Sequence, residues 1–151
     1  MRSRSVRLLF YGVLLAVAVA GCAPGAQRPS RPIRPAGLPD LVPIPHIFSV
    51  DPFSVSFCRL NSQGQLVVLV LNQDMVTGAG ASHTRVEFSP GGSVSKMTDP
   101  VGPAGTAEVS FDVPAACFNP DCNFRITVDS DGEVSESNEG NNTSAWNLCI
   151  G

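Results

Sequence analysis

Residues 107–113 have the sequence Ala-Glu-Val-Ser-Phe-Asp-Val, in which apolar and polar side chains alternate without a break. This period of two is typical of a β-strand with one face toward a core and the other toward solvent. The unbroken apolar run 66–71 is short enough for a fully buried strand. The alternation recurs in four other segments, 53–58, 85–88, 123–128 and 146–150. The pattern predicts an all-β protein, an immunoglobulin-like β-sandwich of about seven strands.

The N-terminus has the organisation of an export signal. Three arginines precede the apolar run 8–20, and small residues follow it. This run is shorter than the roughly 20 residues that a membrane-spanning helix needs. Val19-Ala-Gly-Cys22 resembles the lipobox of bacterial lipoproteins, which implies a signal peptide at 1–21 and acyl chains such as palmitate on Cys22. The alternative is an ordinary secreted protein with Cys22 as a spare thiol.

Residues 23–45 contain seven prolines and almost no apolar side chains before Ile33. Such a segment cannot form a core and favours an extended conformation of roughly 3.1 Å per residue. We therefore divide the chain into the signal peptide 1–21, a lipidated proline-rich tether at 22–38 and a folded domain at 39–151. The arginines of the tether could rest on anionic head groups or stay solvated.

The folded domain is strongly acidic. From residue 38 onward the chain keeps four basic residues against thirteen acidic ones, a formal charge of −9. A protein that binds a phosphate backbone needs a basic surface, so nucleic acid is not an expected partner. Cations or basic surfaces fit this charge better.

Four cysteines follow Cys22, an even number that indicates two disulfides in an exported domain. In the predicted sandwich the first strand lies beside the last, so Cys58 and Cys149 should finish at the same end, both on the outward face. We expect Cys58–Cys149, with Cys117–Cys122 closing the loop before the 123–129 strand. The alternative is a zinc site built from all four cysteines, although only Cys117 and Cys122 have suitable ligand spacing.

Five carboxylates crowd into eleven residues near the C-terminus, at Asp129, Asp131, Glu133, Glu136 and Glu139. Solvent, backbone N–H groups or a cation must relieve their repulsion, and calcium is the natural cation for oxygen-rich loops. The spacing is not that of an EF-hand. The favoured alternative is that the acidic and amide side chains of 138–142 bind loop backbone and align the last strand.

Three segments resemble CARDB, the cell-adhesion-related domain found in bacteria. They are Pro39-Asp-Leu-Val42, Leu69-Val-Leu-Asn-Gln73 and, most specifically, Ile126-Thr-Val-Asp-Ser-Asp-Gly-Glu-Val-Ser-Glu-Ser-Asn-Glu-Gly-Asn-Asn142. The resemblance spans about 39–149 and implies an immunoglobulin-like sandwich used as an extracellular interaction or spacer module. The four paired cysteines are an addition that many members lack.

The sequence contains no sign of catalysis. Its two histidines, His46 and His83, lack a neighbouring nucleophile motif and are expected to be polar surface residues, while Trp146 has the parity of a core residue. We expect no enzyme and no cofactor beyond the lipid and, at most, calcium.

The expected function is an envelope-anchored surface interaction or adhesion module that binds a protein or glycan. A structural spacer or assembly accessory, and a calcium-dependent adhesin, are the alternatives. The expected location is the cell envelope, lipid-anchored and extracytoplasmic; if the cell is Gram-negative the outer membrane is favoured, because Ala23 after Cys22 resembles residues that permit that sorting.

Overall fold

The structure is a computed structural model that describes residues 37–48, 51–117 and 121–150. The predicted signal peptide, Cys22 and the tether up to residue 36 lie outside the described residues. Within the described part, no helix is long and apolar enough to cross a membrane.

The described residues form nine strands in three sheets. A three-stranded sheet has the order β1-β4-β7, a four-stranded sheet has the order β6-β5-β8-β9, and β2 and β3 form a hairpin. All the strand pairs are antiparallel. The strands are β1 (Leu41–Ile44), β2 (His46–Phe48), β3 (Asp51–Ser56), β4 (Leu66–Asn72), β5 (Ser82–Ser89), β6 (Gly92–Thr98), β7 (Thr106–Phe111), β8 (Asp121–Thr127) and β9 (Asn147–Ile150).

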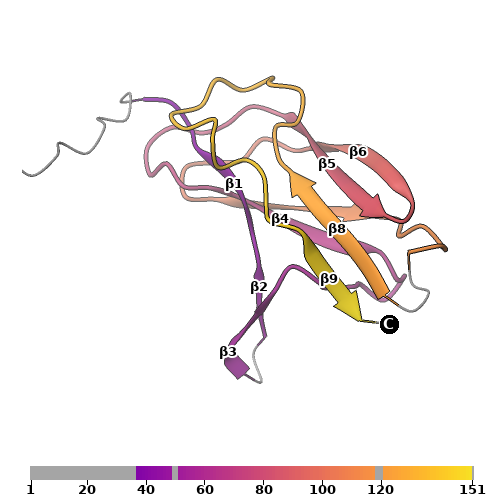
Figure 1. The fold of residues 1–151 in the computed structure, drawn as a ribbon. Coiled ribbons are helices and arrows are strands. Elements are labelled where there is room, and N and C mark those ends of the chain that lie inside the picture. The colour runs from indigo at the N-terminus through magenta and orange to yellow at the C-terminus, as the bar shows by residue number, and fades with distance from the viewer. Residues whose placement is uncertain (1–36, 49–50, 118–120, 151) are drawn as a thin grey trace, which may run out of the picture. The chain divides into compact units, whose positions relative to one another are not determined.

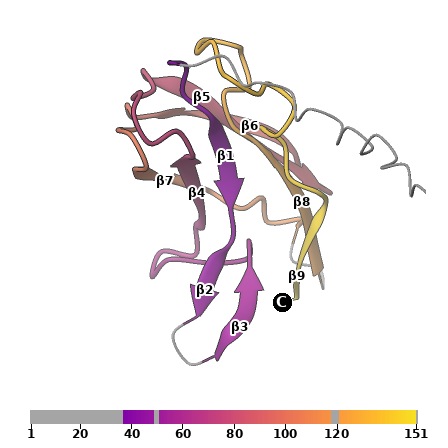
Figure 2. The same cartoon turned by 90° about the vertical axis from the view of Figure 1, so that its left-hand side faces the viewer.

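The two larger sheets enclose one apolar core. Val68 and Phe111 from the three-stranded sheet join Val86, Phe124 and Ile126 from the four-stranded sheet in a single buried cluster. Figures 1 and 2 show the two sheets as separate layers. Burial in β5 alternates strictly along the strand, as the period of two predicts. The predicted all-β, immunoglobulin-like sandwich is confirmed.

The sequence pattern missed three strands, β1, β2 and β6. In β6 the sequence Gly-Ser-Val-Ser-Lys-Met-Thr carries few apolar side chains, because most of this edge strand faces solvent. The expectation that residues 53–58 form a strand paired with the last strand is also wrong. β3 instead pairs with β2, with Ile47 opposite Val55, and Figure 2 shows this hairpin beyond the sandwich.

The last strand faces the opposite way from the expectation. Cys149 is buried, whereas Leu148 and Trp146 are 51% and 48% exposed. The predictions of an outward Cys149 and a core Trp146 are therefore wrong. The inward direction of Cys149 brings its sulfur to Cys58, and the period of two then turns Leu148 and Trp146 outward.

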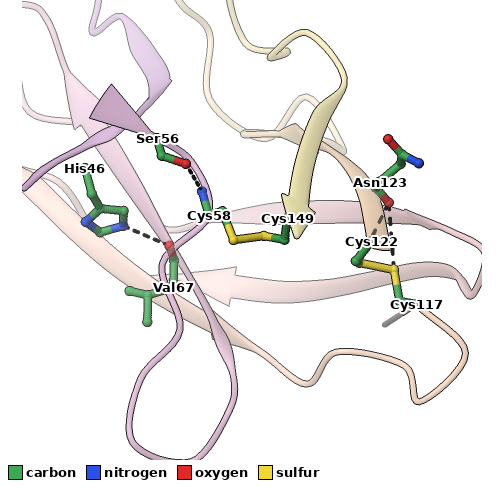
Figure 3. The surroundings of a disulfide bond; sticks show 8 residues. All are labelled: His46, Ser56, Cys58, Val67, Cys117, Cys122, Asn123 and Cys149. Atoms are coloured by element: carbon green, nitrogen blue, oxygen red, sulfur yellow. Dashed lines mark hydrogen bonds between the residues drawn. A yellow bond between two sulfur atoms is a disulfide. The ribbon is translucent and has the colours of Figure 1, made fainter. Parts of the chain in front are cut away.

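Two disulfides close the chain. Cys58 is bonded to Cys149 across 91 positions of sequence, and Cys117 to Cys122 across five. Figure 3 shows the first bond between β9 and the segment that follows β3, and the second at the start of β8. The described part of the chain thus uses its four cysteines in the pairs expected above, not in a zinc site.

The two disulfides should differ in their contribution to stability. In the chain-entropy description the long loop closed by Cys58–Cys149 is worth about 4.6 kcal/mol, against about 2 kcal/mol for the Cys117–Cys122 loop. We expect Cys58→Ser/Cys149→Ser to lower the free energy of unfolding more than Cys117→Ser/Cys122→Ser. Denaturant unfolding of both double variants measures the difference, and an equal loss would contradict it.

Candidate functional site

The residues that sequence analysis singled out lie in one loop between β8 and β9. Residues 129–142, here called the acidic loop, leave the sheet after Thr127 and return where Thr143 forms a bridge with Thr127. In Figures 1 and 2 the loop lies beside the start of β1, at the opposite end of the domain from the β2–β3 hairpin.

Asp129 organises the first turn of the acidic loop. Its backbone is left-handed, with φ of 43°, a conformation that Asp adopts more readily than most residues. Its carboxylate accepts the backbone N–H of Glu133 at 3.0 Å and that of Val134 at 3.2 and 3.3 Å. The Asp129 carbonyl accepts the N–H of Gly132 at 3.0 Å. Asp129 is buried, so its carboxylate holds the turn together from within.

Glu136 links the acidic loop to the first strand. Its side chain is only 6% exposed, and its Oε2 accepts the backbone N–H of Leu41. Its Oε1 accepts a hydrogen bond from Asn142 Nδ2 at 2.8 Å. Burial raises the pKa of Glu136 to about 7, assisted by the charges of Glu139 and Asp129 and opposed by the two hydrogen bonds.

Glu139 completes a group of three carboxylates. Its Oε1 accepts the backbone N–H of Glu136 at 2.8 Å. Asp129, Glu136 and Glu139, here called the inner carboxylates, each place one oxygen within 4.8 Å of the others. Two of the three residues are buried, and only Glu139 is exposed. The interpretation that this segment binds loop backbone therefore holds for Glu139, and the same three side chains also have the spacing of metal ligands.

Asp131 and Glu133 point elsewhere, toward β5. His83 Nδ1 lies 2.8 Å from Glu133 Oε2 and 3.7 Å from Asp131 Oδ2. The hydrogen bond with Glu133 is the main cause of a raised pKa for His83. These three residues, here called the outer group, also have mutually close ligand atoms, but all are at least partly exposed. The structure thus divides the five predicted carboxylates into two separate groups.

The amides of Asn141 and Asn142 lie between the loop and the strands. Asn141 Nδ2 donates to Asp40 Oδ1 at 2.8 Å, and Asn142 Nδ2 donates to Glu136. Both Oδ1 atoms are buried and have no hydrogen-bond partner among the residues that the structure describes. Buried polar atoms are normally paired, so two orphaned oxygens in consecutive residues mark this site as unusual.

Sequence analysis missed two buried polar residues that complete the site. Asn72 Oδ1 accepts the N–H groups of Asp40 and Asp74. Its Nδ2 donates to the carbonyl oxygens of Thr77, Val101 and Gly102. The Asp40 carbonyl accepts the N–H of Gln73, and the Pro39 carbonyl that of Ser137. Asp40 and Asn72 lie inside the two shorter CARDB-like segments, and this resemblance is the sequence feature that could have identified them.

His46 also differs from expectation. His46 is buried, and its Nε2 lies 2.9 Å from the carbonyl oxygen of Val67 while Arg59 contacts Nδ1 at 3.1 Å. Figure 3 shows the contact between His46 and the Val67 carbonyl in the surroundings of the Cys58–Cys149 bond. The prediction of a surface role for His46 is wrong, because the ring ties the β2–β3 hairpin to β4.

The raised pKa of Glu136 predicts a pH dependence. The folded value, about 7, lies above the ordinary value of 4.5, so the folded state binds more protons between them. The free energy of unfolding should therefore fall as pH rises through this window, by at most about 1.4 kcal/mol per pH unit. Glu136→Gln should remove this component, since the amide resembles the protonated acid.

Denaturant unfolding between about pH 5 and pH 8, without divalent cations, measures the effect. The matched control is Glu108→Gln, which changes an exposed carboxylate that pairs with Arg59. An unaltered pH profile in Glu136→Gln would contradict the assignment.

Comparisons with known proteins agree with this fold. The CARDB family model matches residues 53–145, well over half of the chain. A crystal structure of a CARDB domain from Pyrococcus furiosus, described as in complex with di-metal ions, superposes with a TM-score of 0.50 and 21% identity, covering 75% of this chain and 88% of that one. No curated protein sequence matches the chain. The matched segment includes the acidic loop, and the chain belongs to the CARDB family.

Proposed function

We propose that this protein is a lipoprotein of the bacterial cell envelope whose CARDB domain is a non-catalytic interaction module. The disulfide pairing supports the anchor, because four of the five cysteines are bonded to one another and Cys22 is left over for a lipid. Two or more acyl chains, at about 0.8 kcal/mol per buried CH2, give stable attachment to a bilayer. The domain is then extracytoplasmic, on the outer membrane in a Gram-negative cell.

The exposed residues of β9 and the segment before it carry the interaction proposal. Trp146 and Leu148 are about half exposed, on the outer side of the four-stranded sheet. The guanidinium of Arg125 lies 5.1 Å from the Trp146 ring and also pairs with Glu87 at 2.7 Å. An exposed Trp held by a neighbouring Arg is typical of residues that dominate binding to a protein or glycan. A spacer without a ligand does not need such a surface.

Removal of the lipidated cysteine tests the anchor. Cys22→Ser should abolish labelling by a radioactive or clickable fatty acid and release the protein from the membrane fraction. The domain should still fold with both disulfides, since these do not involve Cys22. Persistent acyl labelling of Cys22→Ser would contradict the assignment.

Truncation of the exposed tryptophan tests the interaction module. Affinity capture from envelopes with the wild-type chain should recover partners that Trp146→Ala loses, because truncation of a central interface Trp typically costs 2 kcal/mol or more, which is roughly thirtyfold in affinity. The control is Met75→Ala/Val76→Ala, which changes two more exposed apolar residues between β4 and β5. Identical recovery with all three proteins would favour the spacer, and loss of partners only with chelator would favour the calcium-dependent adhesin.

A further inference from the structure

Among the residues that the structure describes, no basic side chain forms an ion pair with the inner carboxylates. Asp129, Glu136 and Glu139 bring oxygens within 4.8 Å of one another, and two of these side chains are buried. The ion pairs of the described residues involve other acids: Arg59 with Glu108, Lys96 with Asp112, Arg125 with Glu87 and His83 with the outer group. Backbone N–H groups and one amide supply hydrogen bonds to the inner carboxylates, but these donors carry no net charge. A buried charge normally has an ionic partner or a metal ion.

Asn142 supplies an independent indication of a cation. The residue is only 8% exposed, and its amide is directed at Glu136, with Nδ2 at 2.8 Å from Oε1. Its Oδ1, at the other end of the same amide, is buried and finds no donor in the described chain. The nitrogen and oxygen of an Asn amide are hard to tell apart, so the side chain can also be placed in the flipped orientation. Oδ1 then faces Glu136 Oε1, and an ionised carboxylate has no proton to donate to it. In either orientation a buried acceptor oxygen lacks a donor at this site, and a positive ion satisfies acceptor oxygens of this kind.

We propose that Asp129, Glu136, Glu139 and the side-chain oxygen of Asn142 bind one calcium ion. The proposal does not depend on the lipid anchor or on an adhesive partner. Two oxygens on opposite sides of a calcium ion are about 4.8 Å apart, since calcium–oxygen distances are roughly 2.3–2.6 Å, so the observed spacing allows one shared ion.

The donor set selects the class of metal. All four ligands are oxygens, which favours a hard cation over zinc or copper. The ligands come from an irregular loop, and calcium accepts such an arrangement, whereas magnesium requires a near-ideal octahedron and keeps its waters. The outer group contains His83 and lies on the exposed side of the loop, so it is a different site with a different preference.

Calcium at this position would connect the acidic loop to the first strand. Glu136 already accepts the Leu41 N–H, and Leu41 is fully buried in the core. An ion held by Glu136 therefore fixes both the Asp129 turn and the start of β1. Calcium binding should stabilise the folded domain as a whole, because a ligand that binds only the folded state shifts the unfolding equilibrium by mass action.

The test uses the purified full-length chain at about pH 8, with calcium chloride added up to about 10 mM, well above the roughly 0.1–1 mM dissociation constants of extracellular calcium modules. We expect a rise in the midpoint of thermal unfolding and a saturable shift of the Asn142 side-chain amide signals in nitrogen–proton NMR spectra. Magnesium chloride at the same concentration should produce neither change.

Variants distinguish the two groups of carboxylates. Glu139→Gln removes a charge from an exposed residue but keeps a side-chain oxygen that can accept the Glu136 N–H, and it should weaken calcium binding at least tenfold. Asp131→Asn/Glu133→Gln removes two charges from the same loop and should leave binding within about twofold of wild type, which controls for general electrostatic attraction. No calcium-dependent change in either measurement, or a loss of binding in the outer variant alone, would overturn the proposal.

Discussion

The fold depends on a buried carboxylate at one end of the sandwich. Glu136 accepts the Leu41 N–H from a position 95 residues away, and Leu41 opens β1 as a fully buried core residue. The neighbouring residues are held in the same way, since Ser137 donates to the Pro39 carbonyl and Asn72 accepts the Asp40 N–H. Loss of the Glu136 contact would leave the buried Leu41 N–H and one buried carboxylate oxygen of Glu136 without partners, which costs more than the bond itself contributes.

The other end of the domain is closed by covalent chemistry. Cys58–Cys149 joins the region after the β2–β3 hairpin to β9, and Cys117–Cys122 fixes the entry to β8. The first bond has a structural consequence beyond stability, because it turns Cys149 inward and Trp146 and Leu148 outward. The outward direction of Trp146 and Leu148, the surface proposed to bind a partner, therefore follows from the inward direction of the disulfide-bonded Cys149 in the same segment.

Sequence analysis predicted the parts of this structure that local pattern determines. The alternation at 107–113 and the apolar run at 66–71 correspond to β7 and β4 because their burial depends on side chains within each segment. β6 was not predicted, because an edge strand with polar side chains on both faces shows no alternation of apolar and polar residues. The acidic loop was recognised by composition, but its division into two groups depends on His83 and Leu41, which lie about 50 and 95 positions away in sequence.

The position of the acidic loop gives it a mechanical consequence in an anchored chain. If the N-terminus is anchored by lipid as proposed, a pull on it enters the domain at Pro39 to Leu41, and these are the residues that the loop and Asn72 hold. Among the described strands, β1 pairs with β4 alone and lies at the edge of its sheet, so one ladder of backbone hydrogen bonds joins it to the sheet. The disulfides lie beyond this point and cannot share the load until β1 has separated. Glu136 therefore contributes to the resistance of the domain to such a pull, together with Ser137, Asn72 and the β1–β4 pairing, because its carboxylate connects β1 to a loop that is itself continuous with β8 and β9.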